Sequence, residues 1–404
     1  MAEGPRDEAI HGARIGRRPA RSRVVTASMR LSSRELDPLD APAEAESVWR
    51  ALAEAAPPTY FLAWPWVENW LATLPRYVSL RLLVVSDGDA PVLACFIGRR
   101  TVRRAGFVIS RALYLNATGY PDLDDIVIEH NGWLARASDR WPLSRLLEHL
   151  PEGGWDELVL DAMEGDALAG ASVARPRKLR VKRAAPCPVV ELDRVRAAGG
   201  DYLSLLGAQT RSQIRRAARL YQERGPIRVD AATSLGEARA VFRELVSLHQ
   251  ASWSKKGTPG AFTQRYLRDF HERLIDKRFE HGEIQLLRVH AGDRTIGCLY
   301  NFAWNGTVSF YQSGLAYEDD NRLKPGLVCH AEAVAHNAER GFSLYDLLGG
   351  DTRYKRSLST ASSELVWATV QQRRPQFFLE DKLRAMRDRW RSLRAKVGAG
   401  RRDA

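Results

Sequence analysis

The chain has 404 residues, of which 45% are hydrophobic, and it carries a formal net charge of +12 at pH 7. This apolar content excludes a generically disordered chain and can supply one large core or two ordinary ones, so we expect two domains. No apolar run reaches the ~18–20 residues of a membrane-spanning helix. No apolar segment typical of a secretory signal follows the first arginines.

The net charge is concentrated at the two ends of the sequence. Residues 1–34 contain eight Lys and Arg against three acidic residues, and residues 373–404 contain eleven against four. Residues 35–372 are balanced, with 42 of each sign. Because a nucleic-acid groove normally raises the charge of the folded body, this distribution predicts no specific nucleic-acid partner.

The two basic ends differ in pattern. The first is aperiodic and rich in Arg, Ala, Gly and Pro, so we predict that residues 1–45 form a disordered tail. Residues 376–404 instead predict a basic amphipathic helix. Its apolar stripe consists of Leu379, Leu383, Met386, Trp390, Leu393 and Val397. Two interpretations stay open: packing on the body of the protein, or contact with an acidic partner or an anionic membrane, at the inner face.

The cysteines indicate neither a disulfide framework nor a metal site. They lie far apart and form no CxxC or Cys/His ligand spacing, at Cys95, Cys187, Cys298 and Cys329. We therefore expect reduced, buried thiols in a cytoplasmic protein and no metal.

Between the ends, the same order of elements is predicted twice. Residues 46–185 contain a Trp-rich helical stretch, two strands around Gly88–Asp89, further apolar segments, a helix and a strand. Residues 186–375 repeat this order, with the equivalent turn at Gly292–Asp293. The sequence therefore predicts an α/β (α+β) fold of two tandem units, each a mixed, mostly antiparallel twisted sheet flanked by helices.

The most informative segment covers residues 295–358. Its apolar patterning predicts a β-hairpin around Asn305–Gly306 and a helix over residues 326–341. A short apolar strand over residues 343–350 and a charged loop over residues 351–358 follow.

Residues 202–373 resemble the GNAT-type acyltransferase domain of CelD-like and FemAB-like (BioF-associated acetyltransferase) proteins. The resemblance is carried by RSQIRRAARLYQERG, the spaced His249 and Trp253, DRTIGCLYNFAWNGTVSFYQSGL, KPG before a long helix, and FSLYDLLGGDTRYKRSL. It implies a bacterial enzyme of envelope or exopolysaccharide metabolism that takes an acyl group from acyl-CoA or from the phosphopantetheine of an acyl-carrier protein. The second unit would be catalytic, and the first a degenerate copy that shapes the acceptor site.

We predict the donor site at the start of the helix. Backbone N–H groups and the positive dipole end of a helix N-terminus attract phosphate, and the resemblance places the donor pyrophosphate and pantetheine at this turn. The first unit has residues 117–140 in its place. The predicted donor-binding residues are Leu323, Lys324, Pro325, Gly326 and Leu327. The alternative is an ordinary helix start that uses Pro and Gly.

Three residues are candidates for proton transfer. Strand alternation places Tyr311 and Ser313 on one face, where their hydroxyls could protonate or bind a leaving thiolate. Asp346 interrupts an apolar strand, where a carboxylate is costly unless paired or used, so we predict a general base. The alternatives are a packed strand tyrosine and an ion pair of Asp346 with a basic residue of the following loop.

The loop after this strand completes the predicted site. Ligands collect at the carboxyl ends of strands in α/β sheets, and glycines permit close approach. Because the resemblance places the family's Tyr-Lys pair here, Lys355 joins the catalytic candidates. The substrate-binding candidates are Gln312, Ser313, Gly349, Gly350, Asp351, Arg353, Tyr354, His249 and Trp253. The alternatives are a solvated charged loop and, for the histidine and tryptophan, core packing.

The combined prediction is an N-acyltransferase that orients an amine of a small molecule or glycan precursor against a thioester carbonyl. Two other functions stay open at this stage. A FemAB-like transferase that uses aminoacyl-tRNA predicts a basic groove across the body. A non-catalytic GNAT-like interaction module would act through its C-terminal helix.

Overall fold

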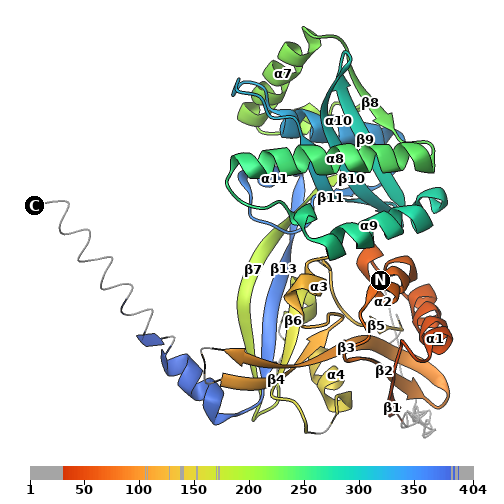
Figure 1. The fold of residues 1–404 in the computed structure, drawn as a ribbon, viewed down its shortest axis with the longest axis vertical. Coiled ribbons are helices and arrows are strands. Elements are labelled where there is room, and N and C mark those ends of the chain that lie inside the picture. Colours follow the sequence, from red (N-terminus) through yellow and green to blue (C-terminus); the bar gives the residue numbers. More distant parts are fainter. Residues whose placement is uncertain are drawn as a thin grey trace, which may run out of the picture.

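The computed structural model describes residues 31–383, except 105, 107, 127, 137–140, 152, 170 and 172, and also residues 385, 386 and 390. The described chain forms two α/β units with the same order of elements: strand, two helices, three strands, helix, two strands. This repetition confirms the tandem fold predicted from the sequence (Figure 1).

The first unit consists of β1 (Leu31–Leu36), α1 (Pro42–Ala55), α2 (Trp64–Thr73), β2 (Leu80–Asp87), β3 (Ala90–Arg104), β4 (Val108–Leu115), α4 (Leu143–His149), β6 (Glu157–Glu164) and β7 (Lys178–Glu191). The second consists of β8 (Ile227–Ala231), α8 (Leu235–Lys255), α9 (Arg265–Arg278), β9 (Ile284–Ala291), β10 (Arg294–Trp304), β11 (Thr307–Leu315), α10 (Pro325–Glu339), β12 (Leu344–Asp346) and β13 (Ala361–Gln371). The link between them holds α6 (Leu192–Ala197), η2 (Tyr202–Leu205) and α7 (Ala208–Gln222). The remaining short elements are η1 (Tyr60–Leu62), α3 (Pro121–Asp124), β5 (Leu134–Ala135), α5 (Gly165–Leu168), η3 (Ala261–Thr263), η4 (Phe279–His281) and α11 (Arg353–Leu358).

The strands form one continuous sheet in which the two units exchange their last strands. The order is β1-β2-β3-β4-β6-β13-β7-β12-β11-β10-β9-β8, and β5 pairs with β3. Thus β13 of the second unit lies next to β6, and β7 of the first lies next to β12. In Figure 1 the long β7 and β13 run between the second unit at the top and the first at the bottom. The domain boundary predicted after residue 185 is therefore wrong, because it divides β7.

The hairpin and helix predicted over residues 295–341 are confirmed. Asn305 and Gly306 join β10 to β11 with φ of 46° and 77°, the left-handed conformation that tight hairpin turns require at both positions. The prediction of a loop over residues 351–358 is wrong, because Arg353–Leu358 form α11. This helix has only six residues, which is too short to give a periodic signal in the sequence.

Apolar packing also joins the units. Trp66 of α2 stands 5.0 Å, ring centre to ring centre, from Phe270 of α9 and 5.5 Å from Phe302 of β10. Near them, the side-chain amide of Asn69 donates to the Phe270 carbonyl over 3.1 Å. Both units therefore contribute to one aromatic core, whereas the two-domain prediction implied separate cores.

The ends of the described chain differ from the predictions. Residues 31–45 are not a disordered tail, because Leu31–Leu36 pair with β2 and α1 begins at Pro42; the rest of the predicted tail lies outside the described residues. Residues 375–383 are helical, but the stripe residues Leu379, Leu383, Met386 and Trp390 are exposed, while Leu393 and Val397 lie outside the described residues. Among the described residues, no helix combines the length and apolarity of a membrane span.

Candidate active site

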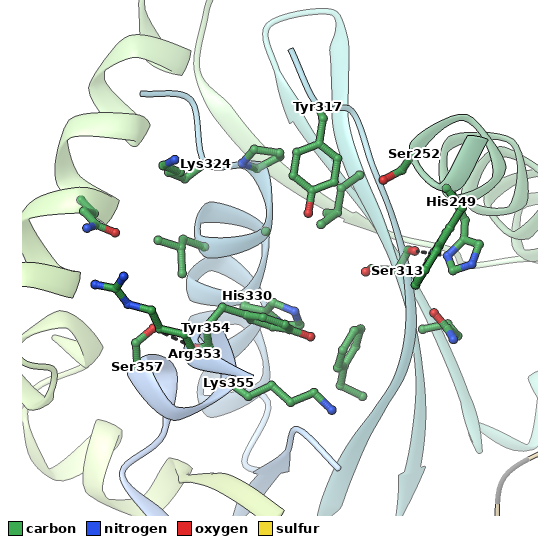
Figure 2. Close-up of a pocket in the computed structure, with 18 of the residues that line it drawn as sticks. His249, Ser252, Ser313, Tyr317, Lys324, His330, Arg353, Tyr354, Lys355 and Ser357 are labelled. Carbon is green, nitrogen blue, oxygen red and sulfur yellow. Dashed lines mark hydrogen bonds between the residues drawn. The ribbon is translucent and has the colours of Figure 1, made fainter. Parts of the chain in front are cut away.

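A cavity of about 730 Å³ lies in the second unit, where two parallel strands separate. β11 pairs with β12 only over Thr307–Ser309 against Leu344–Asp346. Beyond Ser309, residues 310–313 of β11 form one wall and α11 contributes the opposite one. The first turn of α10 lines the space between them (Figure 2).

A β-bulge shapes the strand wall of this cavity. Tyr300 of β10 pairs with Gln312, and the next residue, Asn301, pairs with Phe310, so Tyr311 is an extra residue in β11. A bulge interrupts the hydrogen-bond ladder and changes the direction of the side chains that follow.

The bulge explains why the Tyr311 hydroxyl is not directed as predicted. It donates to the Ile126 carbonyl over 3.0 Å and lies 2.9 Å from Nε2 of His271. Burial raises the pKa of Tyr311 above its ordinary value. Although its ring lines the cavity, the hydroxyl joins the units, so the prediction that it points into the cleft together with the Ser313 hydroxyl is corrected.

The start of α10 presents an electropositive end to the cavity. Lys324 is the N-cap, and its side chain makes no capping hydrogen bond. Lys324, Pro325, Gly326 and Leu327 all line the cavity, so the first turn of a 15-residue helix faces it. An N-terminus of this kind favours phosphate or another anion.

Aromatic side chains form the wall opposite β11. Tyr354 of α11 stacks on His330 of α10, with ring centres 5.9 Å apart and planes 23° from parallel. Burial raises the pKa of Tyr354 to about 12, so its phenol keeps its proton at neutral pH. Figure 2 shows Tyr354 and Tyr317 directed into the same space, with Ser313 on the strand wall.

The side chains of two further polar residues that line this cavity are held by contacts with backbone carbonyls. The Lys355 ammonium donates to the carbonyls of Leu348 and Gly349 over 3.3 and 3.0 Å, and burial lowers its pKa. Nδ1 of His249 lies 3.1 Å from the Ser313 carbonyl, which requires a proton on Nδ1. Burial lowers the pKa of His249, so the imidazole is a neutral support for β11.

Comparison with known proteins assigns this region to a family. Residues 208–356 match the model of the acetyltransferase (GNAT) domain. The chain contains a GNAT acetyltransferase domain. Its α10 start, bulged β11 and α11 are the parts that enclose the cavity.

Several solved structures are similar to this chain. FemX is 12% identical with a TM-score of 0.52, over 84% of this chain and 96% of FemX. The tandem GNAT protein from the clavulanic acid biosynthesis pathway is 12% identical with a TM-score of 0.44, over 85% and 98% of the two chains. L-PGS from Bacillus licheniformis is 10% identical with a TM-score of 0.45, over 81% and 92%. No curated protein matches the chain. At these identities the likeness to FemX supports the fold alone.

Asp346 does not line the GNAT cavity, which corrects the general base predicted there. It ends β12 and is 4% exposed. Its carboxylate lies 2.8 Å from Nε2 of His130, in the first unit, and accepts from the Cys187 thiol over 3.4 Å. The ion-pair alternative was also directed at the wrong partner, since a histidine 216 residues earlier in the sequence takes that place.

Most of the remaining predicted residues line the cavity, and four do not. Gln312, Ser313, Arg353, Trp253 and the residues described above line it together. Leu323 belongs to the apolar core. Gly349 and Gly350 instead line a second cavity of about 510 Å³ beside the first unit. Asp351 is exposed and pairs with Arg356.

Sequence reasoning missed Tyr317, His330 and the α7 residues Gln209, Thr210 and Gln213, all of which line the cavity. His330 occupies a buried position of an apolar helix, and burial and the nearby Lys355 lower its pKa to about 3. Its place three residues after Leu327 on α10 was the available signal, because that spacing puts both on one helix face.

Proposed function

We propose that this protein is an N-acyltransferase that moves an acyl group from a thioester, acyl-CoA or an acyl-carrier protein, to an amine. The observation that carries the proposal is the cavity between β11 and α11, with an uncapped helix start on one side and protonated phenols on the other. The matched GNAT domain supports acyl transfer as the reaction class.

The donor would bind with its phosphate end at the start of α10. Backbone N–H groups of the first helical turn and the Lys324 ammonium supply positive potential there. The amide groups of the pantetheine arm can pair with the backbone of β11 beyond Ser309, where the pairing with β12 has ended. A donor bound in this way would have its thioester near the bulge at Tyr311.

The chemical step requires one carbon–nitrogen bond to form and one carbon–sulfur bond to break. The amine nitrogen attacks the thioester carbonyl carbon, and backbone N–H groups at the interrupted ladder around Tyr311 stabilise the oxyanion. Collapse expels the thiolate, which takes a proton from Tyr354, and the proton lost by the amine passes through water to restore the phenol. No covalent intermediate with the enzyme is needed.

The acceptor would be a small-molecule or glycan-precursor amine in envelope or polysaccharide metabolism, reached from the cytoplasm. Polar residues of α7 (Gln209, Thr210 and Gln213) line the cavity and offer hydrogen bonds to an acceptor. The described C-terminal helix, with exposed Phe378 and Leu379, would hold the enzyme at the inner membrane face or at an acyl-carrier protein.

The test measures donor binding and transfer together. A panel of acyl-CoA thioesters is added to the full chain in thermal unfolding, where a ligand at 100 times its Kd adds about 2.7 kcal/mol. Lys324→Glu should remove most of this shift by placing a negative charge at the anion site. Lys277→Glu on α9 makes the same charge change outside the cavity and should keep it.

The outcomes separate the two donors. A shift with acyl-CoA, together with release of free thiol in the presence of amines, supports acyl-CoA. A response only to acylated carrier protein moves the donor to that protein. A chain that responds to neither would end the enzyme proposal.

The sequence resemblance to FemAB-like proteins leaves one second candidate, a transferase that uses aminoacyl-tRNA. That candidate predicts transfer that ribonuclease abolishes and that high salt weakens strongly. Thiol release that is insensitive to ribonuclease would exclude it.

A further inference from the structure

Three chemically different side chains meet at the joint between the units, outside the acyl-transfer cavity. His130 comes from the segment between α3 and β5, Cys187 from the exchanged strand β7, and Asp346 from the end of β12. Cys187 is fully buried and Asp346 is 4% exposed. The donor atoms therefore come from three segments that are far apart in the sequence, and they converge where β7 pairs with β12.

The donor atoms of the three residues lie within 4.8 Å of one another, close enough to share one ion. Nε2 of His130 lies 2.8 Å from Asp346 Oδ2 and 3.6 Å from Cys187 Sγ, and that sulfur lies 3.4 Å from Asp346 Oδ1. Tetrahedral zinc with bonds of about 2.0–2.3 Å has ligand-to-ligand distances of about 3.3–3.6 Å. The histidine–sulfur distance is already in that range. The contacts with Asp346 use its two different oxygens, so the carboxylate and the imidazole must adjust for one oxygen to share the ion with the other two donors.

Outer hydrogen bonds orient the ligands as they do around metals. Nδ1 of His130 lies 3.0 Å from Glu164 Oε1, a contact that would keep the proton on Nδ1 and leave the lone pair of Nε2 for a bound ion. Asp346 Oδ1 accepts from the Leu348 backbone N–H over 2.7 Å. His130 also adopts a left-handed backbone with φ of 51°, an uncommon conformation for a non-glycine residue that the surrounding structure must maintain.

We propose that His130, Cys187 and Asp346 bind a divalent transition-metal ion, and the mixed nitrogen, sulfur and oxygen donors select zinc over calcium or magnesium. Thiolate and carboxylate neutralise the charge of the ion, and neutral imidazole completes the protein ligands, leaving one position for water. Without a cation, the same geometry requires an imidazolium between two carboxylates next to a buried thiol. The ion explains the convergence of a sulfur on both other donor atoms, which a histidine–carboxylate pair does not need.

The metal would link the two units next to the turn that leads to α11, the helix that forms one wall of the cavity. Asp346 is followed by the turn Leu348–Gly350, whose carbonyls hold Lys355 of α11. On the other side of this turn, Glu129, next to His130, accepts from the Gly349 backbone N–H. We expect the ion to stabilise the joint and to position α11, and its binding does not depend on the acyl-transfer proposal.

The experiment measures zinc directly in the full-length, untagged protein. After reconstitution with zinc and gel filtration, metal analysis should find zinc in proportion to protein in the parent and in Cys298→Ala. That control removes a different buried cysteine, on β10. Cys187→Ala should lose the zinc, and a chelator should lower the Tm of the parent but not that of Cys187→Ala.

A second variant and a spectrum keep the test decisive if Cys187→Ala fails to fold. Glu164→Gln changes an exposed partner of the histidine and should weaken zinc binding roughly 10–100-fold while the chain stays folded. Cobalt in place of zinc should give a thiolate charge-transfer band in the parent. A folded parent that retains no zinc, a cobalt complex without that band, or an unchanged affinity in Glu164→Gln would overturn the proposal.

Discussion

In the first unit, β4 and β6 run parallel over Ala112–Tyr114 against Glu157–Val159, just as β11 and β12 do over three residue pairs in the second. Beyond this pairing the two units differ. The side-chain amide of Asn131 donates to the Leu115 carbonyl over 3.0 Å and to the Asp161 carbonyl over 3.1 Å. One side chain thus bridges the gap between β4 and β6, whereas the corresponding gap in the second unit opens into the cavity of about 730 Å³.

The helix that follows the first of the two parallel strands also differs between the units. α4 has seven residues, and α10 has 15 and begins within the cavity wall. A cavity of about 510 Å³ remains beside the first unit, but α4 contributes none of its lining. The comparison teaches that the repeated sheet is a scaffold shared by both units. What distinguishes the proposed donor site is an unbridged gap between the two parallel strands, together with a long helix that starts at this gap.

Tyr354→Phe gives the largest expected effect. Loss of the proposed proton donor should reduce kcat by roughly 10²–10⁴-fold with little change in donor affinity, because the proposed step has the phenol protonate the leaving thiolate. The matched control is Tyr114→Phe, which changes a tyrosine of the first unit's cavity whose pKa burial also raises to about 12. Steady-state rates of thiol release measure the activity of both variants. Equal losses of activity would contradict the proposal that the reaction takes place in the cavity of the second unit alone.

Asn131→Ala should lower the stability of the protein, whereas Tyr354→Phe should lower its reaction rate. The change removes one hydrogen bond each from the Leu115 carbonyl, the Asp161 carbonyl and the Asn116 amide, which donates to Asn131 over 2.8 Å. We expect the free energy of unfolding to fall by about 2–4 kcal/mol, since buried polar groups would lose their hydrogen bonds. Denaturant unfolding measures this effect.

Ser313→Ala in the open gap is the control for that prediction. Its side chain makes no hydrogen bond among those described, and its carbonyl contact with His249 is retained. We expect a stability change within about 0.5 kcal/mol. If Asn131→Ala proved as mild as Ser313→Ala, the amide would not be what closes the first gap.

The sequence was sufficient for the features that depend on neighbouring residues. Asn305–Gly306 could be predicted as a hairpin turn because the backbone conformation of both residues is encoded locally, and the start of α10 followed from its Pro and its apolar period. The role of Asp346 could not be predicted, because its partner His130 is brought to it by a strand exchange between the units. The direction of Tyr311 depended on a bulge, which one extra residue creates without a sequence signal.

Acid should lower the free energy of unfolding through His330, which lines the cavity of the second unit. No described residue lining the first unit's cavity is a histidine. The folded-state pKa of His330 is about 3 and lies below the unfolded value near ~6.5, so the unfolded chain takes up the proton first. Stability present above pH ~6.5 is therefore lost as the pH falls toward 3, by up to about 1.4 kcal/mol per unit from this residue. Unfolding titrations from pH 7 to 5 should show a smaller slope in His330→Gln, and an unchanged slope would assign the acid lability elsewhere.

Arg183 gives the smallest expected effect, at the mouth of the first unit's cavity. Its guanidinium lies 3.6 Å from the ring centre of Trp367, joining the exchanged strands β7 and β13 on the exposed face. Arg183→Gln removes the cation but keeps a long polar side chain, so we expect a loss of about 0.5–1 kcal/mol in unfolding free energy. Lys182→Gln, next to it on β7, changes the same charge without a described aromatic partner and should cost less. Because the open gap has no contact with either side chain, acyl transfer should be equal in both variants. A selective loss of transfer in Arg183→Gln would instead show that the first unit's cavity takes part in binding the acceptor.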